Sequence, residues 1–259
     1  MMRRWALLGW LLGGLTAGLV WAPARWLTSF LEQLGQQRVL FQDVRGTVWS
    51  GSTQLLLSAG PGSEHAVALP DRLSWHLTPS LLPRPSLDIT FSLPCCTDTP
   101  LHLQASAVWG GGSLRVTDHR SSWPAAALAG LGTPWNTVQA QGRLQLDTQA
   151  LELRWVEQRL QVSGQATLGL INLSSRLSPL KPMGSYRLHL QGGAGTQPMQ
   201  VQLDTLDGRL QLHGRGEWTG ERWRFEGEAS AAPEHEAALS NLLNVLGQRQ
   251  GHKALLTMG

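Results

Sequence analysis

Charged side chains are scarce in this sequence. Asp, Glu, Lys and Arg make up 15% of its 259 residues, against about a quarter in an ordinary globular chain. A helical bundle would be richer in Glu, Lys and Ala, so the composition disfavours that class. The net charge is only +3, and the arginines are spread singly along the predicted strands. This pattern lacks the clustered basic surface of a nucleic-acid-binding protein, and we expect no nucleic-acid partner.

Cysteine and tyrosine are nearly absent, whereas tryptophan is overused. The chain has 1 Tyr and 4 Phe against 12 Trp, and its two cysteines are neighbours, Cys95-Cys96. Neighbouring cysteines do not reach ordinary disulfide geometry without strain. We expect a pair of thiols or an incidental strained bridge, with a link between chains as an alternative in an oxidising compartment. We expect the indoles in the core and at strand ends, where the ring buries a large apolar area and its N–H finds a hydrogen-bond acceptor.

Recognisable catalytic motifs are missing. The sequence has no nucleophile elbow, and no zincin, P-loop or dinucleotide fingerprint. Several histidines alternate with leucines, as at His76 and His189, which is typical of polar positions on exposed strand faces. Asp118 and His119 would point to opposite faces of a strand and make a poor pair for catalysis. We therefore predict no catalytic residue, no cofactor, no metal ligand and no enzyme activity; an envelope hydrolase would need a deep polar pocket that joins Asp118 or His119 to a serine.

Only one long apolar stretch is present, at residues 5–22. Its length of eighteen is close to the ~20 residues that cross a bilayer as a helix. Arg3 and Arg4 precede it, as the positive-inside rule requires, although Arg25 and Arg38 weaken the charge asymmetry. The stretch predicts a transmembrane anchor.

A cleaved signal peptide is the alternative to an anchor. Ala22-Pro23-Ala24 fits a small-x-small cleavage site, but signal-peptide cores are usually only ~7–15 residues long. With the anchor retained, residues 1–4 form a cytoplasmic tail, 25–37 a juxtamembrane amphipathic helix and 38–259 a periplasmic domain.

After residue 37 the apolar positions recur at every second residue, with Gly, Pro, Asp or Ser between the segments. This period predicts antiparallel strands with one buried face. Glycines inside the strand patterns indicate strong curvature. The fold class is mainly β: a strongly curved, largely antiparallel sheet, a meander that is folded over or partly closed, with helices packed on it. The predicted strands are 44–57, 72–78, 86–93, 101–109, 138–146, 150–155, 160–170, 185–191, 199–205, 209–218 and 222–229, with a last strand at 252–258.

Two helices interrupt the predicted strands, a short one at 123–131 and a C-terminal one at 233–246. The second carries an apolar stripe. We expect this stripe to be buried on the sheet; the alternative is a docking face for a partner or for the membrane surface. The stripe consists of Leu239, Leu242, Leu243 and Leu246.

One segment after the apolar stretch is distinctive: Gly46-Thr47-Val48-Trp49-Ser50-Gly51 has a glycine at each end and one large indole between them. With the motifs that follow it in order, it resembles type II secretion system protein N over nearly the whole chain. The motif residues, which we take as structural, are Gly46, Trp49, Gly51, Trp75, Pro79, Tyr186, Gly208, Gly214, Gly216, Trp218, Phe225 and Gly227.

The resemblance implies a non-catalytic accessory subunit in the inner membrane of Gram-negative bacteria, within the apparatus that exports folded proteins across the outer membrane. It implies other inner-membrane subunits of this system as partners. A membrane-tethered periplasmic module that binds or transfers a lipid or another apolar ligand is the alternative, because a curved sheet with one apolar face can leave room for such a ligand.

Overall fold

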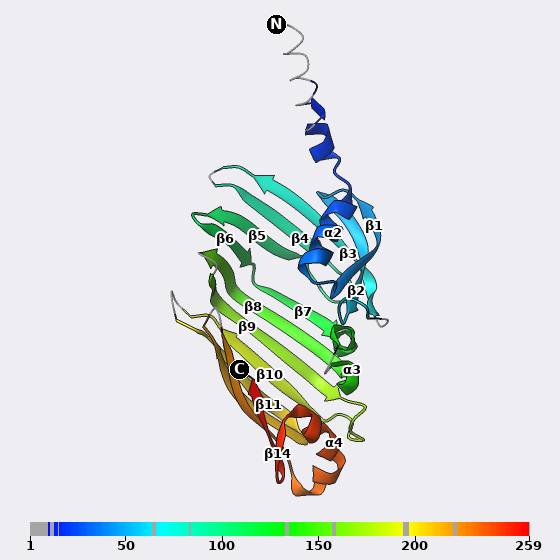
Figure 1. Cartoon of the computed structure of the whole chain (residues 1–259), viewed down its shortest axis with the longest axis vertical. Helices are drawn as coiled ribbons and strands as arrows, with labels where there is room; N and C mark the ends of the chain where they lie inside the picture. Colours follow the sequence, from blue (N-terminus) through cyan, green and yellow to red (C-terminus); the bar gives the residue numbers. More distant parts are fainter. Residues whose placement is uncertain are drawn as a thin grey trace.

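The computed structural model describes residues 10, 13–14, 16–63, 66–82, 84–132, 135–156, 159–193, 197–219 and 222–258. One twisted antiparallel sheet dominates these residues and curls along the length of the molecule (Figure 1). Its strands are β1 (Val39–Gly46), β2 (Ser50–Ser58), β3 (Ala66–Ser80), β4 (Ser86–Ser92), β5 (Leu101–Val108), β6 (Gly111–Val116), β7 (His119–Pro124), β8 (Gln141–Val156), β9 (Arg159–Ser174), β10 (Gly184–Gln191), β11 (Met199–Gly208), β12 (Leu210–Trp218), β13 (Trp223–Ala231), β14 (Gln248–Gln250) and β15 (Lys253–Met258).

Strands that follow one another in the chain lie beside one another in the sheet. The order runs from β1 to β6, continues through β8 to β13 and ends β15-β14, with β7 paired to β8. β8 is long enough to serve two partners: its first half pairs with β7 and its second half with β6. The path has β1 at one end and β14 at the other, so the predicted antiparallel meander is confirmed and the sheet is not closed.

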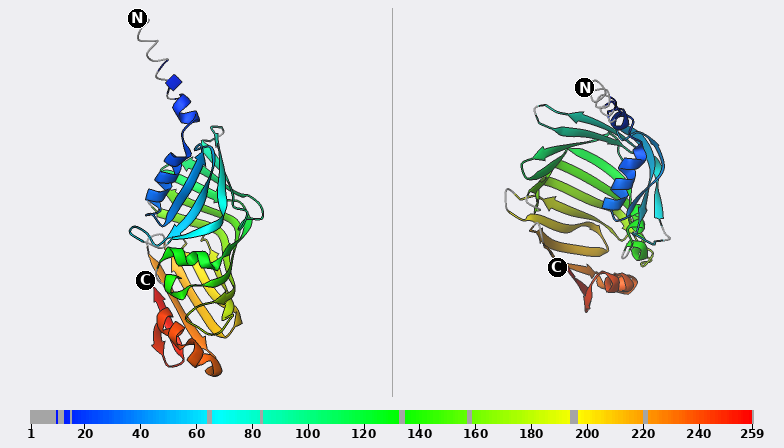
Figure 2. Two further views of the ribbon diagram at one scale, coloured as in Figure 1. Left: turned by 90° about the vertical axis from the view of Figure 1, so that its right-hand side faces the viewer. Right: turned by 45° about the horizontal axis from the view of Figure 1, so that its top comes forward.

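Helices cover one face of this sheet. α2 (Ala24–Leu34) lies across β1–β3, and a 3-10 helix η1 (Ala125–Leu131) with α3 (Trp135–Val138) lies near the middle. A short η2 (Pro233–His235) leads into α4 (Glu236–Leu246) against β13 and β15. Figure 2 shows these helices following one another along the molecule.

The period-two alternation places the apolar residues on the helix-covered face. Across β10 and β11, Leu188 pairs with Leu203, whereas the next pair is Arg187 with Asp204. Cross-strand pairs of like polarity build one apolar and one polar face. The polar positions at His189 and His76 follow this rule, since both pair with threonine or glutamine and not with leucine.

Four buried clusters follow one another along the apolar face. The largest lies under α4 and contains Tyr186, Leu210, Phe225 and Leu239. Tyr186 is fully buried, and its hydroxyl donates a hydrogen bond to the carbonyl oxygen of Leu210 at 3.0 Å. The core is therefore a row of local clusters under separate helices, and not one central body.

Several predicted element boundaries were wrong for identifiable reasons. The predicted strand 44–57 is two strands, β1 and β2, because the chain turns at 47–49. The predicted strands 138–146 and 150–155 are one strand, β8, in which a bulge opposite Gly164 interrupts the alternation. β6 and β7 were missed because each is only six residues long. The helix expected at 123–131 is a 3-10 helix that begins two residues later.

The helices near both ends of the chain agree better with expectation. The helix predicted at 25–37 is α2, and the one at 233–246 is η2 followed by α4. The predicted anchor at 5–22 lies largely outside the described residues. Where the chain is described, it contains no helix that combines enough length with enough apolarity to cross a membrane.

Tyr186 gives a spectroscopic probe of the core, because it is the one tyrosine of the chain. Burial raises the pKa of its hydroxyl above the ordinary value, which is about 10. The unfolded chain therefore loses this proton first, and stability should hold below about pH 10 and fall as the pH rises above it. Ultraviolet titration of tyrosinate should show ionisation well above pH 10 in the folded protein and near 10 in denaturant.

The matched variant is Tyr186→Phe, which keeps the ring and removes the hydrogen bond to Leu210. We expect it to lower the free energy of unfolding by about 1 kcal/mol at neutral pH and to weaken the alkaline loss of stability. Ionisation of the wild-type tyrosine near pH 10 in the folded protein would contradict the buried position.

Candidate interaction site at the N-terminal junction

The N-terminal segment is bound to the sheet at the turn between β1 and β2. The amide of Val48 donates to the carbonyl oxygen of Ala22 at 2.9 Å, and Pro23 forms an isolated antiparallel bridge with Thr47. The indole Nε1 of Trp49 donates to the carbonyl oxygen of Leu19 at 2.8 Å. Main-chain and side-chain bonds thus hold the segment where it reaches the β domain, and we call this contact the junction.

Trp75 of β3 supports the junction from within the core. Its side chain is 5% exposed, and its Nε1 donates to the carbonyl oxygen of Val48 at 3.0 Å. The amide of Leu77 donates to the carbonyl oxygen of Trp49 at 2.7 Å. Trp75 and Leu77 form a buried cluster with Ala24 of α2. The same aromatic residue therefore packs against the helix and fixes the turn that receives the N-terminal segment.

Gly51 makes room for the Trp75 ring. The two residues are paired across β2 and β3. A Cβ atom on Gly51 would lie 2.8 Å from Cη2 of Trp75 and 2.6 Å from the carbonyl oxygen of Arg45. Both distances are shorter than ordinary contacts, so a side chain at Gly51 would displace the indole. Gly46, at the other end of the motif, has a φ of 92°, a region that favours glycine.

α2 extends the junction across the first strands. Its buried residues are Ala24 and Thr28, and near its far end a Glu32 carboxylate oxygen accepts a hydrogen bond from the amide of Phe41 in β1 at 2.8 Å. The chain between Leu19 and Glu32 is thus bonded to the sheet at both ends of α2. These bonds fix the direction in which the N-terminal segment leaves the β domain.

The C-terminal motif residues form a second aromatic contact. The ring of Phe225 in β13 lies over glycines of the neighbouring strand β12 and of its own strand: a Cβ atom on Gly216 of β12 would lie 2.9 Å from Cδ2 of Phe225, and one on Gly227 of β13 would lie 3.1 Å from Cε1. Gly214 is under the same ring. Trp223 stacks on Phe225 with 6.4 Å between ring centroids. An aromatic ring placed over strand glycines compensates for their missing side chains.

The remaining motif residues have structural positions as well. Trp218 lies 6.5 Å from Trp223 between ring centroids, and Pro79 pairs with Leu87 near the end of β3. Gly208 has a φ of 137° where β11 ends. Most motif residues therefore gather at two places, the junction and the Phe225 contact, whereas Pro79 and Gly208 lie near strand ends. Phe225 and Tyr186 both belong to the buried cluster under α4.

The leucine stripe of α4 faces the sheet. Leu239 and Leu243 are fully buried and Leu242 is 2% exposed, and Leu246 packs partly buried against the same cluster. The structure thus favours burial, the first of the two expectations for this stripe. Use of these leucines for docking would require α4 to leave the sheet.

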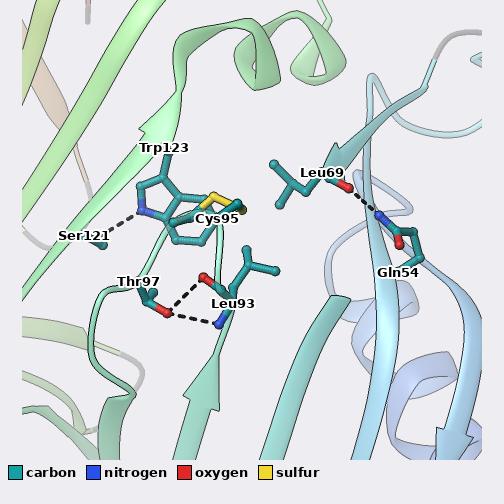
Figure 3. Close-up of a disulfide and its surroundings, with 8 residues drawn as sticks. Gln54, Leu69, Leu93, Cys95, Thr97, Ser121 and Trp123 are labelled. Carbon is teal, nitrogen blue, oxygen red and sulfur yellow. Dashed lines mark hydrogen bonds between the residues drawn. A yellow bond between two sulfur atoms is a disulfide. The ribbon is translucent and has the colours of Figure 1, made fainter. Parts of the chain in front are cut away.

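The two cysteines form a disulfide with adjacent Cα atoms 3.8 Å apart. Figure 3 shows Cys95 beside the indole of Trp123, whose Nε1 donates to Ser121 Oγ at 2.9 Å. Cys96 is buried with Leu69 and Leu93, and Thr97 exchanges hydrogen bonds with the main chain of Leu93. Of the alternatives that the sequence left open, the structure contains the bridge, placed in the core between β4 and β7.

Titratable groups on the described part of the chain do not assemble into a reactive centre. No group of three or more His, Cys, Asp or Glu side chains is arranged there to hold a metal ion. Asp118 accepts a hydrogen bond from the amide of Ala150 at 2.6 Å and so holds a strand connection. An open hollow of about 890 Å³ is lined by residues of β11–β13 and β15; His213 and Asp204, an ionisable pair in its lining, are 3.9 Å apart and exposed.

These features define a class: an open antiparallel sheet with helices along one face and an N-terminal segment bound into the first strand turn. The sequence profile described as type II secretion system (T2SS), protein N matches residues 37–255. The chain therefore belongs to the type II secretion system protein N family and is an accessory subunit of that system. No curated protein and no solved structure matches the chain.

Sequence reasoning found the motif residues but missed what most of them do together. The indole of Trp49 bonds to Leu19, thirty positions earlier, and no local pattern indicates that partner. The Gly51–Trp75 contact had one usable signal, a glycine and a tryptophan at the same position of neighbouring strands. That signal becomes visible only when the register is known.

Gly51 tests the junction directly. We expect Gly51→Ala to lower the free energy of unfolding by about 1–3 kcal/mol, since the added methyl group overpacks against Trp75 and the main chain of Arg45. The measurement is the urea midpoint of the purified chain in detergent, with the slope checked for two-state behaviour.

Gly112→Ala in β6 is the matched control. A Cβ atom there would find its nearest neighbour, the carbonyl oxygen of Ser106, at 3.7 Å, so its stability should stay within about 0.5 kcal/mol of the wild type. Equal effects of the two substitutions would show that the close approach at Gly51 is unimportant.

Proposed function

We propose that this chain is a non-catalytic scaffold subunit of the type II secretion system. Residues 5–22 hold it in the inner membrane as a single-pass anchor, and the sheet stands in the periplasm, where it contacts other inner-membrane subunits and supports export of folded proteins across the outer membrane. The observation that carries the proposal is the junction. It joins the N-terminal segment rigidly to the sheet of a chain that belongs to a secretion family.

A rigid junction suits a scaffold better than a tethered enzyme. Three hydrogen bonds and one bridge described above connect the segment at Leu19–Glu32 to β1 and to the β1–β2 turn. A flexible linker would let the domain search the space around its anchor, whereas this arrangement gives the sheet a set orientation to the membrane. A scaffold subunit needs such a fixed orientation to hold its partners at defined distances from the membrane.

The sheet edges are candidate contact surfaces. β14 is an exposed strand of only three residues, which gives little main chain for strand addition. β1 is longer but bulged between Gln42 and Arg45. There Arg45 and Arg72 donate to the Asp43 carboxylate and hold the pKa of that carboxyl below its usual value. Bulges and charges on an edge discourage unselective strand pairing, so we propose that partners recognise β1 through these side chains.

Genetic and biochemical tests address the scaffold role. Deletion of the gene should reduce the amount of exported protein in the medium several-fold, with the cargo retained in the periplasm. The full chain, extracted in mild detergent, should bring down other type II secretion subunits. Normal export together with recovery of the chain alone would contradict the proposal.

The anchor is tested separately. The chain purified from membranes should keep residues 1–22 by intact mass, and it should stay in the membrane fraction after alkaline carbonate washing. A version that begins at Pro23 behind a cleavable leader should be released into the periplasm and should fail to restore export. A mature wild-type chain without its first 22 residues, free in the periplasm, would contradict anchoring.

A lipid- or hydrophobe-binding module remains the second candidate, because part of the apolar face is open. Between the helices, apolar residues of the central strands are only half-buried, among them Leu103, Leu114, Leu153 and Leu188. Extraction of the purified chain followed by mass spectrometry discriminates the two functions. One lipid bound per chain would favour this second candidate, and a lipid content no higher than that of an unrelated membrane protein would count against it.

A further inference from the structure

Three large apolar side chains stand in solvent at the tips of two hairpins. Leu81 and Leu82, between β3 and β4, are 78% and 84% exposed, and Trp109, between β5 and β6, is fully exposed. We call these residues the hairpin tips. Monomeric soluble proteins rarely gather exposed apolar residues in this way without a partner.

The turn at Trp109 does not need an indole. Val108 pairs with Gly111, so Trp109 and Gly110 form a two-residue hairpin turn, and Gly110 has a φ of 77°. Asn-Gly or Asp-Gly is the usual choice for such a turn. Within the described chain, the indole makes no contact that offsets the cost of its exposure. A contact with something outside the chain therefore explains a tryptophan at this position better than the turn geometry does.

The hairpin tips lie at the end of the sheet from which the N-terminal segment leaves. In the antiparallel order, the β1–β2, β3–β4 and β5–β6 turns share one end of their strands. Ser50, just after the junction, pairs with His76, and β3 continues to Ser80. At about 3.3 Å per residue, the stretch of β3 from His76 to Ser80 reaches roughly 13 Å beyond the level of Ser50. In Figure 1 the β3–β4 turn lies at the upper left of the sheet, and the N-terminal segment leaves the upper part of the molecule to the right of it.

Positive charge accompanies the exposed apolar groups. Arg84 is exposed and close to Leu82 in the chain. With Arg115 it borders a hollow of about 230 Å³ on the polar face, whose other lining residues are Ser86, Gln104, Ser106 and Ser113. Arg115 also has a weak ion pair with Glu152, at 3.6 Å. Indoles favour the membrane–water boundary, and arginines near it attract lipid phosphates, so this combination matches a phospholipid surface.

We propose that Leu81, Leu82 and Trp109 insert into the same phospholipid bilayer that holds the N-terminal anchor, with Arg84 facing the lipid phosphates. The proposal rests on the anchor of the proposed function and adds a second membrane contact to it. Two contacts set the tilt of the sheet over the membrane, whereas a single helix leaves the sheet free to rotate about it. The occupant of the hairpin tips is the bilayer, and no protein partner is needed there.

Single cysteines make the test direct, because both natural cysteines are held in the disulfide. An environment-sensitive fluorophore is attached to Leu81→Cys or Trp109→Cys of the full chain in vesicles of phosphatidylethanolamine and phosphatidylglycerol. The control is Gln250→Cys, an exposed position in β14 at the other end of the molecule. We expect blue-shifted emission at positions 81 and 109, with more than half of it lost when spin-labelled lipid is included, and neither effect at 250.

The outcomes separate this proposal from the anchor. Water-like emission at 81 and 109 in a chain that resists carbonate extraction overturns the hairpin contact and leaves the anchor standing. Loss of the wild-type chain from the vesicles in carbonate overturns the anchor and, with it, the proposal. Shielding at 81 and 109 in native envelopes but not in vesicles shows a protein occupant and overturns the lipid assignment. The triple variant Leu81→Ser, Leu82→Ser, Trp109→Ser should stay membrane-bound, yet lose the shielding of a fluorophore at the neighbouring Arg84→Cys position.

Discussion

The contact between the Trp75 indole and Gly51 is the constraint on which the rest of the arrangement depends. The ring reaches the main chain of β2 only because Gly51 has no side chain. From that position its Nε1 bonds to Val48, and the amide of Val48 bonds in turn to Ala22. This close approach thus fixes the turn, and the turn fixes the path of the N-terminal segment. That path in turn fixes the orientation of the sheet relative to the segment. A larger residue in place of Gly51 would disturb all three.

The sheet stays ordered without closing because its helices are distributed. α2 and α4 each bury one cluster on the same face, and η1 with α3 contributes to the other two. Each cluster stabilises the strands beneath it, and the stretches between clusters keep their leucines half-buried. In this way a chain with few charged residues and many leucines forms a long sheet whose apolar face is covered by helices in several separate places. The opposite, polar face carries exposed ion pairs and, on the described residues, no buried reactive group. This face is therefore available for contacts on its solvent side.

Much of this fold could be predicted from residue order, and the failures share a cause. Period-two alternation identified most strands, and glycine and proline identified the ends of the C-terminal helix. The β1–β2 turn was missed because Thr47-Val48-Trp49 continues the alternation through the turn. The joined strand β8 was missed because its bulge shifts the alternation. The Trp49–Leu19 bond and the shared position of the hairpin tips depend on strand pairing and on contacts distant in the chain, which a local pattern does not encode. The motif glycines were located, but their aromatic partners were not.

The nearest-neighbour order of the strands has a consequence for how the chain acquires its shape. Nearly every strand pairs with the one made just before it, so few contacts wait for distant parts of the polypeptide, and such local pairing favours rapid assembly. A chain that folds from its N-terminus adds one hairpin at a time to a sheet already in place. The exceptions are β8, which pairs with β6 as well as with β7, and the C-terminus, where β15 lies between β13 and β14. Because β14 is held in the sheet only through β15, it joins the sheet after β15 has paired with β13.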